Sequence, residues 1–270
     1  DEFMNINLDS STIHNLYAPY DLVKTMRSSI LVLGPLLAKY GEAKVSLPGG
    51  CAIGMRPVDM HLEALMRMGA EINVESGYIT AKAKRLKGTQ INFPKKTVTG
   101  TENIIMAASL ADGYTKINNS ANEPEISDLC IFLNKMGAKI KGYGTDIIEI
   151  EGVNALNATS HKPLPDRIEA GTFMIAAVIT RGDIEINNIV PEHSMAVIQK
   201  LEEAGADIKI TDDSVRVIMK NRPKAVDIET NAYPHFPTDM QAQITALNTI
   251  ALGESTVREN IFENRFMHVQ

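Results

Sequence analysis

The chain has 270 residues, of which 44% are hydrophobic, and its formal net charge is −6. This composition supplies enough apolar material for a core and excludes an intrinsically disordered protein. No apolar run reaches the roughly 18 residues of a membrane span, and no signal peptide is visible, so we expect a cytoplasmic protein without a membrane partner. The acidic charge argues against a nucleic-acid partner. Two cysteines are too few for a disulfide framework or a four-cysteine zinc site.

A repeat of 68 residues organises the chain. The tetrad Gly-Ala-x-Ile begins at Gly69, Gly137 and Gly205, each time after a stretch whose apolar residues follow helical spacing. We expect helices over these stretches, each ended by a glycine in the left-handed conformation and followed by a strand. The stretches are 61–68, 127–136 and 194–204.

A second apolar helix repeats in phase with the first. It occurs four times and runs into Gly41, Gly113, Gly182 and Gly253, each followed by an alternating strand. These helices are apolar on nearly all sides, which predicts burial on several faces. Pro35 lies inside the first of them and is expected to kink it.

One unit therefore reads strand–helix–strand–helix–strand–strand. The clearest instance starts with a strand at 90–94, followed by helices near 102–112 and 124–136. We expect three complete units and a fourth that is cut, because the period would place the next tetrad near residue 273, beyond Gln270. A natural chain with a degenerate last repeat is the alternative.

The stretch 156–166 is polar, contains two prolines and predicts a linker. It would divide the chain into part of one lobe, residues 1–165 with two units, and part of a second, residues 166–270 with one full and one cut unit. The predicted fold class is thus α/β, built of repeated β-α-β-α-β-β units in two lobes and truncated at both ends.

The segment LPGGCAIGMRPVD, residues 47–59, carries the densest chemical signal. Its glycines make a loop that permits unusual dihedrals, and Pro57 suits the first turn of a following helix. Cys51 would lie near free helix amides that attract anions, and Arg56 adds a positive charge. Such a thiol is a candidate acid or nucleophile, although a cysteine is often a packed small hydrophobe. We expect that second role for Cys130, on a helix interior face.

This segment and four others closely resemble the UDP-N-acetylglucosamine enolpyruvyl transferase family. The others are APYDLVKTMR (18–27), LPDRIE (164–169), FPTDMQAQ (236–243) and FENRFMH (262–268), in the family's order. The resemblance implies an inside-out α/β barrel of six units in two lobes. It also implies transfer of the enolpyruvyl group of phosphoenolpyruvate to the 3′-hydroxyl of UDP-N-acetylglucosamine, a step toward peptidoglycan, with phosphate released and with neither a metal nor another cofactor.

By the same resemblance, Cys51 is the loop acid, can form an adduct with phosphoenolpyruvate, and is the cysteine that fosfomycin alkylates. Asp239 matches an aspartate near the sugar 3′-hydroxyl and would be the base or its orienting partner; an ordinary helix cap is the alternative. Arg56 would grip phosphate, Arg265 would face the phosphoenolpyruvate carboxylate, and Arg27 would face the nucleotide sugar.

The nucleotide end of the substrate is expected on two segments. The first, against the diphosphate and uridine, consists of Arg56, Pro57, Val58, Asp59 and Met60. The second, which matches the family's uridine loop, consists of Lys96, Thr97, Val98, Thr99 and Gly100. It departs from the common form, because Val98 cannot make a hydroxyl contact. Ile261 occupies the position whose backbone meets the N-acetyl group.

Other functions stay open. Family segments that carry further charged groups are missing from this sequence, so the chain alone is expected to be weakly active or inactive. A non-catalytic nucleotide-sugar-binding fragment is the alternative. The shikimate-pathway enolpyruvyl transferase shares the fold, but the Gly-Gly-Cys loop and the uridine turn argue against it. An RNA-terminal phosphate cyclase relative would favour a basic surface that this acidic chain lacks.

Overall fold

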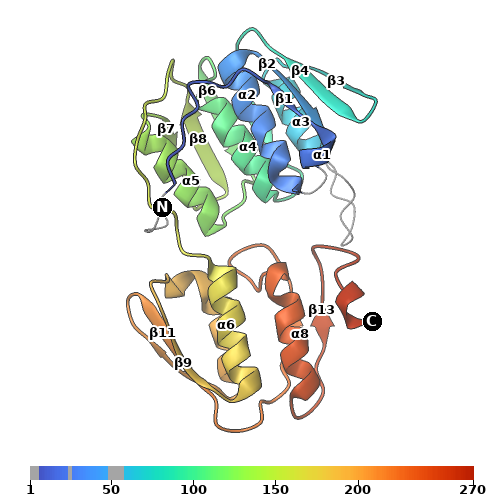
Figure 1. Ribbon diagram of the computed structural model, residues 1–270, viewed down its shortest axis with the longest axis vertical. Coiled ribbons are helices and arrows are strands. Elements are labelled where there is room, and N and C mark those ends of the chain that lie inside the picture. Colours follow the sequence, from blue (N-terminus) through green and yellow to red (C-terminus); the bar gives the residue numbers. More distant parts are fainter. Residues whose placement is uncertain (1–5, 24–25, 48–57) are drawn as a thin grey trace.

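Two lobes, one above the other in Figure 1, make up the protein. The structure, a computed structural model, describes residues 6–23, 26–47 and 58–270, except for the side chain of Arg27. A segment at 152–166, itself fully described and without regular secondary structure, joins the lobes. Within the described part of the chain, no helix is long and apolar enough to cross a membrane.

The N-terminal lobe opens with one four-stranded unit. Its strands lie in the order β1-β2-β4-β3, with β1 parallel to β2 and the other neighbours antiparallel. Its elements are β1 (Tyr17–Ala18), α1 (Tyr20–Val23), the 3-10 helix η1 (Arg27–Val32), α2 (Leu33–Tyr40), β2 (Glu42–Ser46), α3 (Asp59–Arg67), β3 (Glu71–Glu75) and β4 (Tyr78–Lys82).

A second unit repeats this topology, with the strand order β5-β6-β8-β7. Again the first pair is parallel and the others are antiparallel. Its elements are β5 (Gln90–Asn92), α4 (Val98–Ala108), β6 (Tyr114–Asn118), α5 (Pro124–Lys135), β7 (Lys139–Lys141) and β8 (Ile147–Glu151). The element order is the one that the sequence repeat predicts.

The C-terminal lobe contains the third unit and the start of a fourth. The third consists of α6 (Arg167–Thr180), β9 (Asp183–Asn187), the 3-10 helix η2 (Pro191–Ser194), α7 (Met195–Glu203), β10 (Asp207–Ile210) and β11 (Ser214–Ile218). The fourth consists of β12 (Ile228–Glu229), the 3-10 helix η3 (Thr238–Met240), α8 (Gln241–Ile250) and β13 (Val257–Arg258), with η4 (Met267–Val269) after it.

The third unit corrects one expectation. Its sheet has the order β10-β11-β9, and the described residues 152–166, between β8 and α6, contain no strand, so the unit lacks its first strand and is not complete. The preceding stretch contains Pro163 and Pro165, which lack the N–H that a ladder needs. The fourth unit, by contrast, does have a first strand, because β12 pairs in parallel with β13 across α8.

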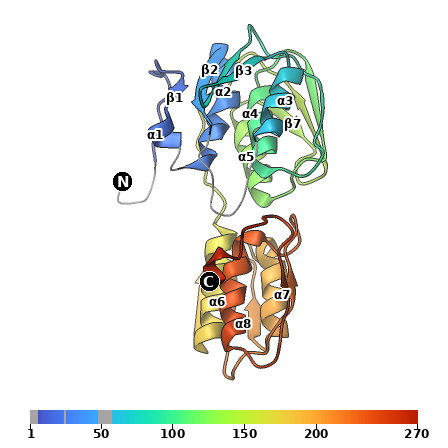
Figure 2. The ribbon, with the colours of Figure 1, turned by 90° about the vertical axis from the view of Figure 1, so that its right-hand side faces the viewer.

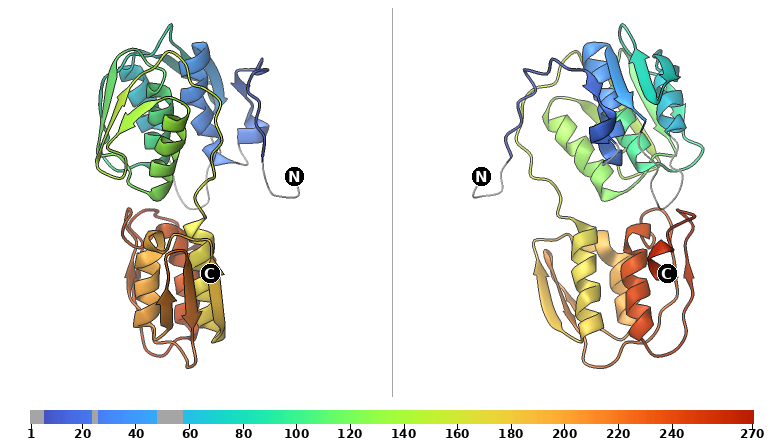
Figure 3. Two further views of the ribbon diagram at one scale, coloured as in Figure 1. Left: turned by 90° about the vertical axis from the view of Figure 1, so that its left-hand side faces the viewer. Right: turned by 45° about the vertical axis from the view of Figure 1, so that its right-hand side comes forward.

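The buried apolar residues form two separate cores. One cluster draws its members from residues 23–150 and the other from residues 170–251. In the C-terminal lobe, α6 and α8 lie side by side, with strands on their outer side (Figures 1 and 2). In the N-terminal lobe, α2 approaches α4 closely at Gly34, where an added Cβ would come within 2.2 Å of Asn103 Oδ1. Figure 3 shows that the first described residues run beside this lobe rather than inside it.

The helix-ending glycines were mostly predicted correctly. Gly69, Gly137 and Gly205 have φ angles of 91°, 101° and 102°, in the region that glycine adopts without steric cost. Gly182, for which only the end of an apolar helix was predicted, differs from these three, because α6 ends at Thr180 and Arg181 takes the left-handed position with a φ of 54°.

Two helix boundaries also differ from the prediction. Pro35 lies in the first turn of α2, where its missing N–H has no helical acceptor to lose. The break in this apolar stretch is instead the change from η1 to α2 at Leu33. Helix α4 begins at Val98, earlier than expected, because the Thr97 side chain caps it by accepting from Gly100 N at 3.2 Å.

Candidate functional site

Four predicted site residues cannot be placed by their side chains. Cys51, Arg56 and Pro57 lie outside the described residues, and Arg27 is described only as the backbone start of η1. The other predicted residues fall into two groups, one on each lobe. The first group is Val58, Asp59, Met60, Lys96, Thr97, Val98, Thr99 and Gly100; the second is Asp239, Ile261 and Arg265.

The first group lies at two neighbouring helix starts. Val58 is buried just before α3, Asp59 is its exposed first residue, and Met60 is half-buried. Val98 and Thr99 form the first turn of α4 rather than a loop. The first N–H groups of a helix have no partner within it and suit an anion or a carbonyl oxygen. The two segments can therefore offer backbone donors to one ligand.

A hydrogen bond joins these two helix starts. His61 Nε2 lies 3.4 Å from Thr99 Oγ1, although the residues are 38 positions apart. A small hollow beside them is lined by Met60 and by Phe93 and Pro94, which lead toward Lys96. Val98 packs its half-buried side chain against the core, in keeping with the absence of a hydroxyl there.

Asn103 is the fully buried centre of this arrangement. Its Oδ1 accepts from Gly34 N at 2.8 Å, and its Nδ2 lies 3.2 Å from Ile30 O and 3.0 Å from His61 Nδ1. Because the amide nitrogen only donates, His61 Nδ1 accepts, and His61 Nε2 carries the hydrogen that faces Thr99. Asn103 thereby ties η1, α2, α3 and α4 together.

Sequence reasoning overlooked both Asn103 and His61. The available signal was a polar residue on the buried face of an otherwise apolar helix, since a fully buried polar side chain needs hydrogen-bond partners. The partners themselves could not have been named from the pattern.

Lys96 does not project freely into solvent. Its ammonium forms an ion pair with Asp146 and donates to Ser120 O at 3.1 Å. Asn122 Nδ2 donates to the same carboxylate at 2.8 Å. These contacts, that of Lys96 first, hold the pKa of Asp146 below its usual range. A substrate group at Lys96 would share the ammonium with Asp146 or displace it.

The second group centres on an ion pair. Arg265 Nη2 lies 2.9 Å from Asp239 Oδ1, and the Arg265 guanidinium stacks over the Phe262 ring at 5.5 Å. Neither η3 nor α8, both within the described residues, carries a side-chain cap hydrogen bond. Asp239 is therefore not the helix cap that was its alternative role. Ile261 is exposed in the loop before Arg265.

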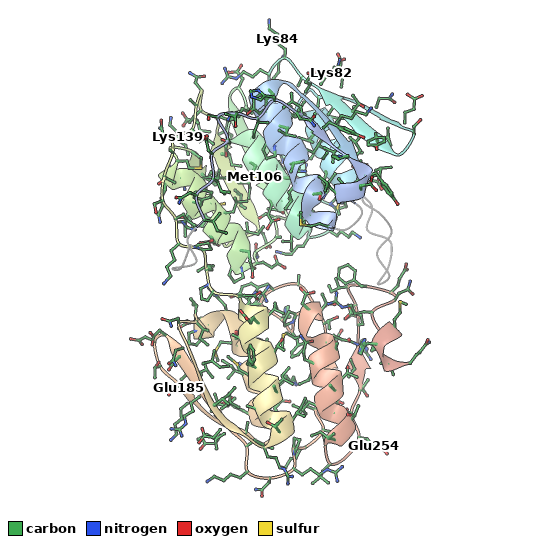
Figure 4. The ribbon with its side chains drawn as sticks, viewed as in Figure 1. Lys82, Lys84, Met106, Lys139, Glu185 and Glu254 are labelled. Atoms are coloured by element: carbon green, nitrogen blue, oxygen red, sulfur yellow. The ribbon has the colours of Figure 1, made fainter. Side chains whose placement is uncertain are left out.

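One ion pair between the lobes links the surroundings of the two groups. Lys96 reaches Ser120, shortly before α5, and Glu125 in the first turn of α5 pairs with Arg167 Nε at 3.0 Å. The Arg167 guanidinium lies 5.5 Å from the Tyr233 ring centre, in the segment that leads to Asp239. Figure 4 shows charged side chains on the sides away from this junction, among them Lys82, Lys84, Lys139, Glu185 and Glu254.

Comparisons with known proteins agree with this architecture. The family model described as EPSP synthase (3-phosphoshikimate 1-carboxyvinyltransferase) matches residues 4–270. The solved enolpyruvyl transferase NikO from Streptomyces tendae superposes with a TM-score of 0.76 over 91% of this chain and 59% of its own, at 19% identity. An EPSP synthase from Acinetobacter baumannii gives 0.58 over 85% of this chain and 54% of its own, at 21% identity. The fold is the α/β fold of enolpyruvyl transferases.

Curated relatives are more similar in sequence. The UDP-N-acetylglucosamine 1-carboxyvinyltransferase of Hydrogenovibrio crunogenus is 57% identical over 100% of this chain and 65% of its own length. The protein of the same name from Ruthia magnifica subsp. Calyptogena magnifica is 61% identical over 97% of this chain and 63% of its own. The chain thus spans less than two thirds of the relatives that it matches. It belongs to the EPSP synthase (3-phosphoshikimate 1-carboxyvinyltransferase) family.

Proposed function

We propose that this chain is part of an enzyme that transfers the enolpyruvyl group of phosphoenolpyruvate to the 3′-hydroxyl of UDP-N-acetylglucosamine and releases phosphate. The observation that carries the proposal is the identity of 57% and 61% to two relatives named for this carboxyvinyl transfer. The contact of Thr99, in the second predicted nucleotide-binding segment, with His61, the residue directly after the first, supports it. The product would be a precursor of peptidoglycan.

The second group supplies chemistry that this transfer needs. Asp239 would take or orient the proton of the 3′-hydroxyl as its oxygen attacks C2 of phosphoenolpyruvate. Arg265, in contact with Asp239, is a cation that can face the carboxylate of the same substrate. By the family resemblance, the Cys51 thiol would protonate the methylene carbon, which gives a tetrahedral adduct with a methyl group. Loss of phosphate from C2, together with loss of a proton from that methyl group, would then restore the double bond of the enolpyruvyl product.

The nucleotide would lie on the N-terminal lobe and the reacting groups between the lobes. We propose lobes of residues 1–165 and 166–270 in an inside-out barrel of six units. The matching strand orders of the first two sheets and the separate cores support this division.

Two measurements on this chain test the function. Calorimetric titration is expected to detect UDP-N-acetylglucosamine but not shikimate 3-phosphate. Fosfomycin is expected to label Cys51 and leave buried Cys130 unmodified, as read by peptide mass spectrometry. Binding of shikimate 3-phosphate in place of the nucleotide sugar would overturn the proposal.

A non-catalytic nucleotide-sugar-binding fragment is the second candidate, because the chain spans 62–65% of its relatives' length. Phosphate release in the presence of both substrates separates the two functions. Release that Asp239→Asn abolishes, with nucleotide-sugar binding retained, indicates catalysis. Binding with neither release nor Cys51 labelling indicates the binding fragment.

A further inference from the structure

We infer that Glu259 is a positioning residue. Its carboxylate fixes the separation between Asp239 and the backbone of Ile261, the two groups that would hold the N-acetylated sugar. The inference rests on the proposed function and extends it to a residue that no motif singled out. Glu259 follows β13 directly and is half-buried, between the segment that carries Asp239 and the loop that carries Ile261.

The Glu259 carboxylate binds both segments at once. Thr238 Oγ1, next to Asp239 in the chain, lies 3.0 and 2.9 Å from its two oxygens. On the other side, the backbone N–H groups of Ile261 and Phe262 donate to Oε1 at 2.8 and 3.0 Å. Hydrogen bonds to an ionised acceptor are the stronger kind. One side chain therefore joins η3 to the 259–262 loop.

The base of this loop is itself anchored. Asn260 N donates to Thr230 Oγ1 at 3.0 Å, and Asn260 Nδ2 donates to Glu229 Oε1 at 2.7 Å. Thr230 is fully buried and follows β12, the parallel partner of β13. Because Glu259 follows an anchored strand end, its carboxylate can hold Thr238 and the 259–262 loop in place.

The bond to Ile261 decides which backbone group faces the substrate. Because the Ile261 N–H donates to Glu259, the remaining backbone group is the Ile261 carbonyl oxygen. A carbonyl oxygen accepts the N–H of an acetamido group. Ile261 would therefore recognise the N–H of the N-acetyl substituent.

The geometry of the sugar explains why the separation of Ile261 and Asp239 matters. The acetamido group and the reacting hydroxyl stand on neighbouring carbons, C2 and C3, of the same ring. Ile261 and Asp239 must therefore keep a fixed separation, and Glu259 holds the segments of both. Loss of the carboxylate should loosen the contact to the sugar while leaving the nucleotide contacts on the N-terminal lobe unchanged.

The test compares three probes, UDP-N-acetylglucosamine, UDP-glucose and UDP, by calorimetry on the unmodified chain and on variants. Glu259→Ala is expected to weaken UDP-N-acetylglucosamine binding by about 10-fold or more, which corresponds to the loss of one charge-assisted hydrogen bond. Binding of UDP should stay within about twofold. The preference over UDP-glucose, which lacks the acetamido group, should fall toward one.

Two further variants make the result specific. Glu259→Gln keeps an acceptor for the N–H groups of Ile261 and Phe262 and should restore much of the preference. Glu263→Gln removes an exposed carboxylate directly after the 259–262 loop and should bind like the unmodified chain. Thermal unfolding of each variant checks that the lobe is folded.

The outcomes separate the two hypotheses. If the unmodified chain prefers UDP-N-acetylglucosamine and folded Glu259→Ala keeps that preference, the positioning role is overturned and the proposed function stands. If Glu259→Ala weakens all three probes equally, the positioning role is likewise overturned. If the unmodified chain binds none of the three, the proposed function itself fails.

Discussion

Two polar side chains, one fully buried and one half-buried, hold segments of the candidate site together. Asn103 joins three helical segments through its amide, and the Glu259 carboxylate joins two segments of the C-terminal lobe. Sequence reasoning proposed residues to face a ligand but did not identify these supports. The core role of Cys130 was predicted and is confirmed, since the side chain is fully buried and burial raises its thiol pKa to about 12.

Glu102 gives a pH-dependent prediction at this scale. Burial first, and then the charges of Glu125 and Glu123, raise its carboxyl pKa from 4.5 to about 7. Between these two values the folded chain holds a proton that the unfolded chain releases, so the free energy of unfolding falls as pH rises through this window. We expect Glu102→Gln to be more stable than the unmodified chain at pH 8, by about 1–3 kcal/mol.

Urea unfolding at pH 5 and pH 8 measures this effect. The difference between Glu102→Gln and the unmodified chain should shrink at pH 5, where Glu102 is largely protonated in the folded state. Glu63→Gln, at an exposed position on α3, is the control and should not change the slope of stability with pH. An identical pH slope for Glu102→Gln and the unmodified chain would contradict the prediction.

Most helices and strands follow directly from the repeat. Helices α3, α5 and α7 begin and end within three residues of the predicted stretches 61–68, 127–136 and 194–204. Apolar spacing marks the buried face of each helix, and the following glycine marks its end. The errors came where another residue supplied the boundary. Thr97 capped α4 ahead of its expected start, and Arg181 ended α6 in place of Gly182. The spacing of apolar residues alone predicts neither the Thr97 cap at the start of α4 nor the left-handed Arg181 at the end of α6.

The glycine after α7 gives a prediction at the element scale. Gly205 has a φ of 102°, and an added Cβ would have no neighbour closer than Met219 Cε at 3.8 Å. Gly205→Ala should therefore destabilise through backbone strain alone, by about 1–2 kcal/mol.

Gly182→Ala is the matched control. Gly182 lies outside the left-handed region. Its added Cβ would come close to the rotatable Thr180 hydroxyl at 3.3 Å and would make ordinary contact with Ala177 O at 3.6 Å. Its effect should stay within about 1 kcal/mol. Urea unfolding of both variants provides the measurement, and equal losses would show that backbone strain is not the cause.

At the scale of the whole molecule, polar contacts among the described residues link the lobes and the segment that joins them. Glu125 of α5 binds Arg167 at the start of α6, and the joining segment is held to α5 by His161 Nε2 at 2.9 Å from Asp128 Oδ1. The two cores are separate, so each lobe has its own source of stability. A site between the lobes then depends on contacts that can change without unfolding either core.

The Glu125–Arg167 pair gives a prediction at this scale. Its side chains are 48% and 11% exposed, which limits the interaction to about 0.5–1 kcal/mol. A double-mutant cycle with Glu125→Gln and Arg167→Gln, followed by thermal unfolding at low salt, should show this coupling. In 1 M salt the coupling should decrease, since about half of the carboxylate is open to solvent.

The pair Arg216–Asp183, within one sheet of the C-terminal lobe and about half exposed on both sides, is the control. Its variants should leave unfolding of the N-terminal lobe unchanged, whereas the Glu125–Arg167 variants should affect both lobes. A coupling of zero at low salt would show that the lobes are not held together by this pair.

The sequence by itself determined the repeat, the order of elements in a unit, the core role of Cys130 and the family segments. These features depend on local spacing and residue type, which a single chain displays directly. Only the tertiary structure decided that His61 meets Thr99, that Asp239 pairs with Arg265 and that Glu259 bridges Thr238 and Ile261. Such contacts join residues that are distant in the chain or lie in irregular loops, and packing selects them from many acceptable hydrogen-bond partners.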